Sequence, residues 1–84
     1  MPKVEIYAKD YCPYCTKAKA LLDKKGVEYT DYDITYDVME QTKMRERAEG
    51  RKTVPQIFID DKGIGGCDDL YALDQKGELD ALLA

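Results

Sequence analysis

The sequence of 84 residues contains no histidine. Cys–His nucleophile pairs and Ser–His–Asp triads both need an imidazole, so both classes of active site are excluded. Mixed Cys/His zinc sites are excluded for the same reason, and a structural zinc site made only of cysteine needs four of them, whereas this chain has three. A metal site would need a carboxylate, a second subunit or an exogenous thiol, and we expect no metal.

Long apolar runs are also missing. No segment approaches the roughly 18 consecutive apolar residues of a membrane span. Lys3, Glu5 and Lys9 interrupt the N-terminal segment, which therefore lacks the apolar core of a signal peptide. We expect a cytoplasmic protein without a membrane partner. An odd number of cysteines argues against a disulfide-stapled secreted scaffold, and closely spaced cysteines in a reducing compartment are more often catalytic or metal-binding than structural.

Positive charge is scarce: Lys and Arg number 13 against 17 Asp and Glu, which gives a net charge of −4 and a pI of about 4.7. Binding to a phosphate backbone requires clustered cations, so we expect no nucleic-acid partner. The densest basic stretch, Lys43, Arg45 and Arg47, is interleaved with Glu46 and Glu49 and is typical of the solvated face of a helix.

The length allows one domain, residues 1–84, and a composition of 44% hydrophobic and 36% charged residues is ordinary for a globular protein. Alternation predicts a strand over 4–8. A helix over 13–25 follows, opened by Pro13 and closed by Gly26, with an apolar stripe at helical spacing. That stripe consists of Tyr14, Ala18, Leu21 and Leu22.

The rest of the chain is predicted to form three further strands and two helices. We expect a strand over 27–34, then a surface helix from a capping-box spacing at Asp37 and Glu40 to about residue 49. A strand over 56–59, a turn over 60–63 and a brief strand over 64–66 form a hairpin. A helix begins near residue 68, is interrupted by Gly77, and ends in an apolar turn. The order β-α-β-α-β-β-α predicts an α/β fold with a four-stranded mixed sheet flanked by helices.

The segment Cys12-Pro13-Tyr14-Cys15 lies between the first predicted strand and the first predicted helix. A C-x-x-C in this context is a redox signature. At the helix start, Cys12 meets free N–H groups and the positive end of the helix dipole, which favour a thiolate. Cys15 lies one turn later, within reach of a mixed disulfide at Cys12. The alternatives are two inert buried cysteines or a metal site completed from outside the chain.

Three segments together resemble the dithiol glutaredoxins of the thioredoxin superfamily, most of all the small bacterial type numbered three. They are Cys12-Pro13-Tyr14-Cys15, Thr53-Val54-Pro55-Gln56-Ile57-Phe58-Ile59 and Gly65-Gly66-Cys67-Asp68-Asp69-Leu70. The resemblance covers essentially the whole chain and implies a thioredoxin-like fold. It also implies a glutathione-binding site around the cysteine pair.

By this resemblance, Thr53, Val54 and a cis Pro55 border the active cysteine, and the Val54 backbone binds glutathione like a neighbouring strand. Gly66 precedes a helix start at which the backbone N–H groups of Cys67 and Asp68 hold the γ-glutamyl carboxylate. The Asp68 side chain takes the ammonium group.

The resemblance also assigns Lys9 to the glycine carboxylate of glutathione, with added positive charge from Arg51 or Lys52. Tyr14 is expected to line the cleft or, equally, to pack in the core. Cys67 is expected as a small packed residue, with a second interpretation in which it is open to oxidation.

The implied activity is glutathione-dependent thiol–disulfide exchange. Cys12 alone reduces glutathionylated mixed disulfides, and Cys12 with Cys15 reduces protein disulfides. Expected partners are glutathione, glutathionylated proteins and protein disulfides, with ribonucleotide reductase as a typical family client, and the chain is expected to be a monomer. Two rival functions stay open, a thioredoxin-like donor served by a reductase and a dimeric [2Fe–2S] carrier, although Pro13 resembles members that do not carry a cluster.

Overall fold

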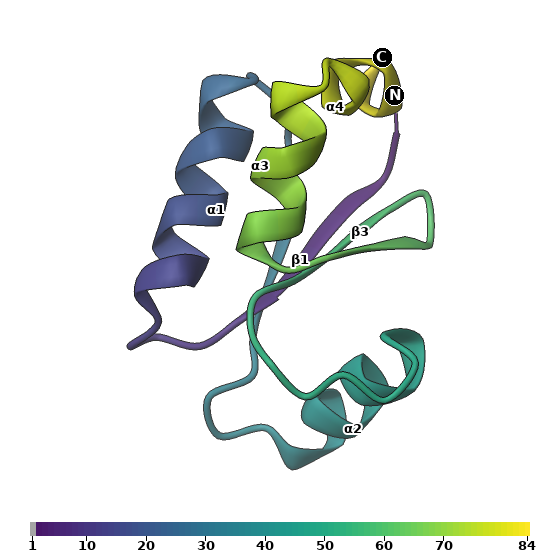
Figure 1. The fold of residues 1–84 in the computed structure, drawn as a ribbon. Coiled ribbons are helices and arrows are strands. Elements are labelled where there is room, and N and C mark those ends of the chain that lie inside the picture. The colour runs from purple at the N-terminus through teal and green to yellow at the C-terminus, as the bar shows by residue number, and fades with distance from the viewer. Residues whose placement is uncertain (1) are drawn as a thin grey trace.

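The structure, a computed structural model, describes residues 2–84. Strands and helices alternate over the first part of this chain, and a strand hairpin and two helices follow (Figure 1). They are β1 (Val4–Ala8), α1 (Pro13–Lys24), β2 (Thr30–Asp33), α2 (Val38–Arg47), β3 (Gln56–Ile59), β4 (Lys62–Gly65), α3 (Cys67–Gln75) and α4 (Glu78–Leu83).

The four strands form one mixed sheet in the order β2-β1-β3-β4. β1 pairs in parallel with β2, whereas the β1–β3 and β3–β4 pairs are antiparallel. The predicted four-stranded mixed sheet is therefore confirmed. Two residues with positive φ, Asp60 and Asp61, make the tight turn between β3 and β4, so β4 begins at Lys62, earlier than the sequence pattern predicts.

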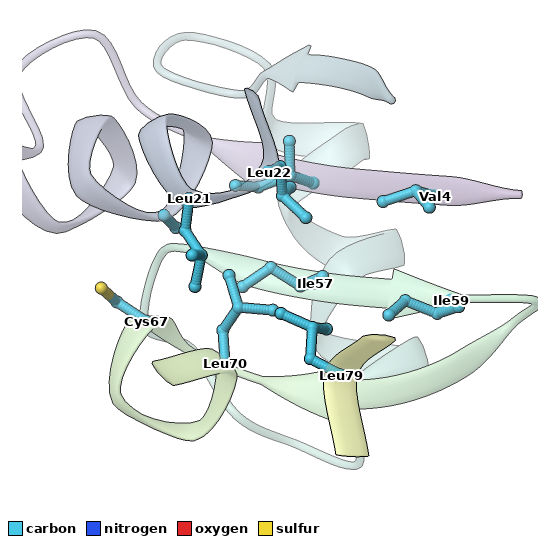
Figure 2. Close-up of a cluster of buried hydrophobic side chains, with 10 residues drawn as sticks. Val4, Leu21, Leu22, Ile57, Ile59, Cys67, Leu70 and Leu79 are labelled. Atoms are coloured by element: carbon cyan, nitrogen blue, oxygen red, sulfur yellow. The ribbon is translucent and has the colours of Figure 1, made fainter. Parts of the chain in front are cut away.

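One face of the sheet is covered by α1, α3 and α4 and is packed with aliphatic side chains. Alternation along β1 and β3 turns Val4, Ile6, Ile57 and Ile59 toward this face. Figure 2 shows how Leu21 and Leu22 of α1 meet Leu70 of α3 and Leu79 of α4 above these strands. The first residues of α1 and α3 therefore lie beside each other, at the end of the sheet that carries the cysteine pair (Figure 1).

The other face is covered by α2 and is richer in aromatic rings. Its buried cluster consists of Tyr7, Ile34, Met44, Ala48 and Phe58. Asp37 caps the helix by accepting a hydrogen bond from the Glu40 N–H at 3.0 Å, as the capping-box spacing predicts. α2 is a surface helix as predicted, because Val38 and Met39 are exposed. Only the side facing the sheet contributes to the core.

A buried ion pair joins α2 to β1, which the sequence pattern did not predict. Glu5 is 3% exposed, and both of its carboxylate oxygens accept hydrogen bonds from Arg47, at 2.9 and 3.2 Å. Arg47 also donates to the Tyr7 hydroxyl and lies over the ring of Phe58. The expectation of a wholly solvated basic face on this helix is therefore wrong for Arg47. The guanidinium group is needed to neutralise a carboxylate inside the fold.

Three further expectations are corrected. β2 is shorter than the range 27–34, because Val27 and Tyr29 pack against the aliphatic cluster from a loop rather than from a strand. The last apolar turn is a separate helix, α4, since Gly77 adopts a left-handed conformation between it and α3. Tyr14 is 59% exposed and does not belong to the buried stripe of α1, where Cys15 takes that place. Within residues 2–84, no helix is long and apolar enough to cross a membrane.

Candidate active site

The cysteine pair lies where α1 begins, beside the loop that enters β3. Cys12 is the N-cap of α1, and its Sγ accepts a hydrogen bond from the Cys15 N–H at 3.0 Å. The Val54 carbonyl oxygen lies 3.8 Å from the same sulfur, and the Val54–Pro55 peptide bond is cis. An N–H donor and the positive end of a helix both stabilise a sulfur anion, so the position suits an attacking thiolate.

The two cysteines differ sharply in environment. Cys12 is partly exposed, whereas Cys15 is 1% exposed. Burial, and secondarily the hydrogen bond with Cys12, raises the pKa of the Cys15 thiol to about 12. Cys15 is therefore a neutral thiol at physiological pH, and Cys12 is the accessible sulfur of the pair. This asymmetry agrees with the order of attack predicted from the sequence.

A cleft of about 370 Å³ opens between the start of α1, which has Cys12 as its N-cap, the loop before β3 and the start of α3. It brings together six residues that the sequence predicts at the site: Tyr14, Thr53, Pro55, Gly66, Cys67 and Asp68. Arg51 and Asp69 complete its wall. Of the two alternatives for Tyr14, lining the cleft is the one that the structure shows.

The start of α3 forms one end of this cleft. Asp69 accepts a hydrogen bond from the Gly66 N–H at 2.9 Å and pairs with Arg51 at 3.4 Å. Gly65 has a φ of +109°, and a Cβ atom at this position would collide with the Asp69 carboxylate. The first-turn N–H groups of Cys67 and Asp68 have no acceptor within the helix, which makes this end of the cleft suited to a carboxylate.

Cys67 is both a core residue and a cleft residue. It is buried in the aliphatic cluster (Figure 2), and it also belongs to the cleft wall. Burial raises the pKa of its thiol. Cys67 is thus a small residue packed at a helix start, as predicted, while the second interpretation, in which its thiol is open to oxidation, stays a prediction.

Lys9 does not line this cleft. It lies in a second hollow of about 240 Å³, together with Gln41, Met44, Arg45 and Lys52. The two candidate cations of the sequence analysis are therefore separated, Arg51 in the cleft and Lys52 in the hollow. Arg45 was not predicted at the site, because the alternation of charges around it is also typical of a solvated helix. Among residues 2–84, no three histidine, cysteine or acidic side chains are grouped so as to hold a metal ion.

These features define a thiol–disulfide oxidoreductase of the thioredoxin fold, and comparison with known proteins gives the family. The Glutaredoxin family model matches residues 4–64. The chain is 57% identical over 83 residues to glutaredoxin 3 of Escherichia coli strain K12, covering 99% of both chains. The chain belongs to the glutaredoxin family, whose members carry out glutathione-dependent thiol redox reactions.

Solved structures agree with this assignment. A glutaredoxin from Brucella melitensis has a TM-score of 0.84 at 51% identity, with 96% of this chain and 87% of that chain covered. The crystal structure of a buckwheat glutaredoxin–glutathione complex has a TM-score of 0.88 at 30% identity, with 98% and 76% covered. The predicted thioredoxin-like fold is confirmed, and the buckwheat protein binds glutathione on the same fold.

Proposed function

We propose that this chain reduces glutathionylated proteins through Cys12 alone, and protein disulfides through Cys12 together with Cys15. The observation that carries the proposal is the contrast between the two sulfurs. Cys12 is accessible, sits at a helix start and accepts an N–H hydrogen bond, whereas Cys15 is buried with a pKa of about 12. The Cys12 sulfur is suited to attack a client, and the Cys15 sulfur to attack the resulting mixed disulfide afterwards.

In the monothiol route, the Cys12 thiolate attacks the glutathionyl sulfur of a mixed disulfide. The client leaves as its thiolate, which takes up a proton, and a Cys12–glutathione disulfide forms. A second glutathione thiolate then attacks the glutathionyl sulfur, which frees Cys12 and yields oxidised glutathione. This route needs no second cysteine of the protein.

In the dithiol route, Cys12 attacks a sulfur of the client disulfide and forms a mixed disulfide with it. Cys15 then loses its proton and attacks the Cys12 sulfur, which releases the reduced client and leaves a Cys12–Cys15 disulfide. Two glutathione molecules reduce this disulfide and become oxidised glutathione. The hydrogen bond from the Cys15 N–H to the Cys12 sulfur is 3.0 Å long, so the backbone of Cys15 lies next to that sulfur.

We assign glutathione to the cleft at the start of α1. Its γ-glutamyl carboxylate would meet the first-turn N–H groups of Cys67 and Asp68, and its ammonium group the Asp68 side chain. The Val54 backbone would pair with its cysteine residue, since the Val54 N–H has no acceptor among residues 2–84. Lys9 and Lys52, in the second hollow, would meet its glycine carboxylate.

The deciding experiment uses the Cys15→Ser protein with glutathione and a glutathionylated peptide. We expect reduction of the peptide to be retained, because the monothiol route uses Cys12 only, and to be abolished by Cys12→Ser. Loss of activity in a Cys15→Ser protein with an unchanged circular dichroism spectrum would overturn the monothiol route. It would favour a thioredoxin-like donor, which NADPH and thioredoxin reductase would then reduce.

We infer a cytoplasmic monomer, because the chemistry needs a supply of reduced glutathione and free thiols, as a reducing compartment provides. Ribonucleotide reductase is a typical client for the family. Sedimentation of the reduced protein at a mass near 9.6 kDa would support the monomer, and a mass twice as large would contradict it.

A further inference from the structure

Three of the five residues that line the hollow containing Lys9 are cations. Its charged residues come from three separate segments: Lys9 from the loop after β1, Arg45 from α2, and Lys52 from the loop before β3. Gln41 and Met44 of α2 complete it. Folding therefore gathers three positive charges that are dispersed in the sequence.

These three cations have no anionic partner within residues 2–84. Six other Lys and Arg residues form salt bridges there: Lys3, Lys19, Lys25, Lys43, Arg47 and Arg51. The chain carries 17 acidic side chains and a net charge of −4, so carboxylates for such pairs are plentiful. A cluster of unpaired positive charge on an acidic protein attracts an external anion.

Two cations of the hollow belong to the chain segments that carry the redox site. Lys9 precedes Cys12 by three residues, and Lys52 precedes Val54 by two, with the Val54 carbonyl 3.8 Å from the Cys12 sulfur. Glutathione carries one carboxylate on the residue that follows its cysteine. A single carboxylate can neutralise one of the three cations, and the other two are then available to bind further anionic groups.

We propose that Arg45, together with Lys9 and Lys52, binds acidic side chains that follow the reactive cysteine of a client disulfide. The dithiol route then prefers clients in which one or two Asp or Glu residues come directly after that cysteine. Such a segment presents its carboxylates where glutathione presents its glycine carboxylate, with additional charge for Arg45. This inference rests on the proposed function, since it concerns the client of the same site.

The test is a single-turnover reaction of the pre-reduced protein, without glutathione, with three peptide disulfides. The peptides differ only in the two residues after each cysteine, which are Glu-Glu, Gln-Gln or Lys-Lys. Acid quenching and mass spectrometry give the rate at which each peptide is reduced. We expect the Glu-Glu peptide to react at least about tenfold faster than the Gln-Gln peptide at low salt, and this ratio to fall as salt screens the charges.

Two variants assign the effect to the hollow. Arg45→Gln is expected to slow the Glu-Glu peptide more than the Gln-Gln peptide, so that the preference shrinks. Arg45 is exposed, so this change leaves the core intact. The matched control is Lys24→Gln, which removes another exposed cation from the last turn of α1, roughly 18 Å along the helix from Cys12. We expect Lys24→Gln to leave all three rates unchanged.

Different outcomes would contradict the client preference, the role of Arg45 and the dithiol route. Equal rates for the three peptides, or faster reduction of the Lys-Lys peptide, would overturn the inference while the proposed function stands. A Glu-Glu preference of the same size in Arg45→Gln, or one lost equally in Lys24→Gln, would overturn the role of Arg45. Failure to reduce any of the peptides would instead overturn the dithiol route itself.

Discussion

The two faces of the sheet bury their side chains in different ways. The face under α1, α3 and α4 is an aliphatic interior in which Leu22, Leu70 and Leu79 are fully inaccessible to solvent (Figure 2). The face under α2 contains the aromatic rings of Tyr7 and Phe58 together with the charged pair of Glu5 and Arg47. The first face is stabilised by transfer of apolar surface out of water, whereas the second also depends on charge neutralisation.

The redox centre lies on the boundary between these two faces. The helix that carries Cys12 and Cys15 packs on the aliphatic side through Ala18, Leu21 and Leu22. Val54, whose carbonyl approaches the Cys12 sulfur, packs instead against the cluster under α2. The aliphatic face thus positions the cysteines, and the α2 face positions the backbone opposite them.

The largest effect is expected from a cavity in the aliphatic face. Leu22→Ala should lower the free energy of unfolding by about 2–5 kcal/mol, because the transfer energy of the side chain is lost and a void is left. Such a loss is a large part of the roughly 5–15 kcal/mol that stabilises a small domain. Urea denaturation measures it. Val38→Ala on the exposed side of α2 serves as the control, with a change within about 0.5 kcal/mol. Equal losses in both variants would contradict the assigned core.

A smaller loss is expected on the α2 face from Arg47→Met. The substitution keeps an aliphatic stem but leaves the Glu5 carboxylate buried without its guanidinium. Breaking a fully buried pair costs about 3–5 kcal/mol. We expect about 2–3 kcal/mol here, since Arg47 is a quarter exposed and Tyr32 still donates to Glu5. The double variant Glu5→Gln/Arg47→Met should recover most of the loss. A double variant no more stable than Arg47→Met would show that an unpaired charge is not the cause.

The pH dependence of the free energy of unfolding should also differ between variants on the two faces. Hydrogen bonding to Arg47 holds the pKa of Glu5 below its ordinary value of 4.5. The stability that this carboxylate contributes is therefore fully present above about pH 4.5 and is lost as the pH falls through the lower folded value. In Arg47→Met, burial without the guanidinium favours the protonated acid instead. The deficit of Arg47→Met in urea denaturation should shrink between pH 7 and pH 3.5, whereas that of Leu22→Ala should stay constant. A constant deficit in both variants would contradict the charge origin.

The aliphatic face could be predicted from the sequence, whereas the buried ion pair of the α2 face could not. The period of two along 4–8 and the helical spacing of Ala18, Leu21 and Leu22 identify apolar surfaces from neighbouring residues alone. The same alternation assigns Glu5 to a polar side, because its partner Arg47 is 42 residues away in the sequence. Burial of a charge depends on a contact that only the complete topology creates.

The residues of the active site likewise include some that the sequence predicts and some that it does not. The cysteine spacing and the helix-opening proline predict Cys12 and Cys15, because the function of this pair depends on local backbone geometry. The other residues of the cleft are predicted only through the resemblance of the three motifs to a known family. Arg45 escaped prediction because its function depends on Lys9 and Lys52, which come from other segments. Interleaved charge on a helix does not show which cations lack a carboxylate after folding.

The smallest effect is expected from an ion pair at the rim of the aliphatic face. The Lys25 ammonium group lies 2.6 Å from the Asp74 carboxylate and 2.8 Å from that of Asp80, distances as short as those of the Glu5–Arg47 pair. Hydrogen bonds to these carboxylates, the one to Asp74 most strongly, raise the pKa of Lys25. Lys25 and both carboxylates are accessible to water, so little is gained when they pair. We expect Lys25→Met to destabilise less than Arg47→Met, and the difference from wild type to disappear near 1 M salt, where the Debye length is about 3 Å. Urea denaturation at low and high salt measures both variants. A salt-independent loss as large as that of Arg47→Met would show that distance, and not burial, sets the strength of ion pairs in this protein.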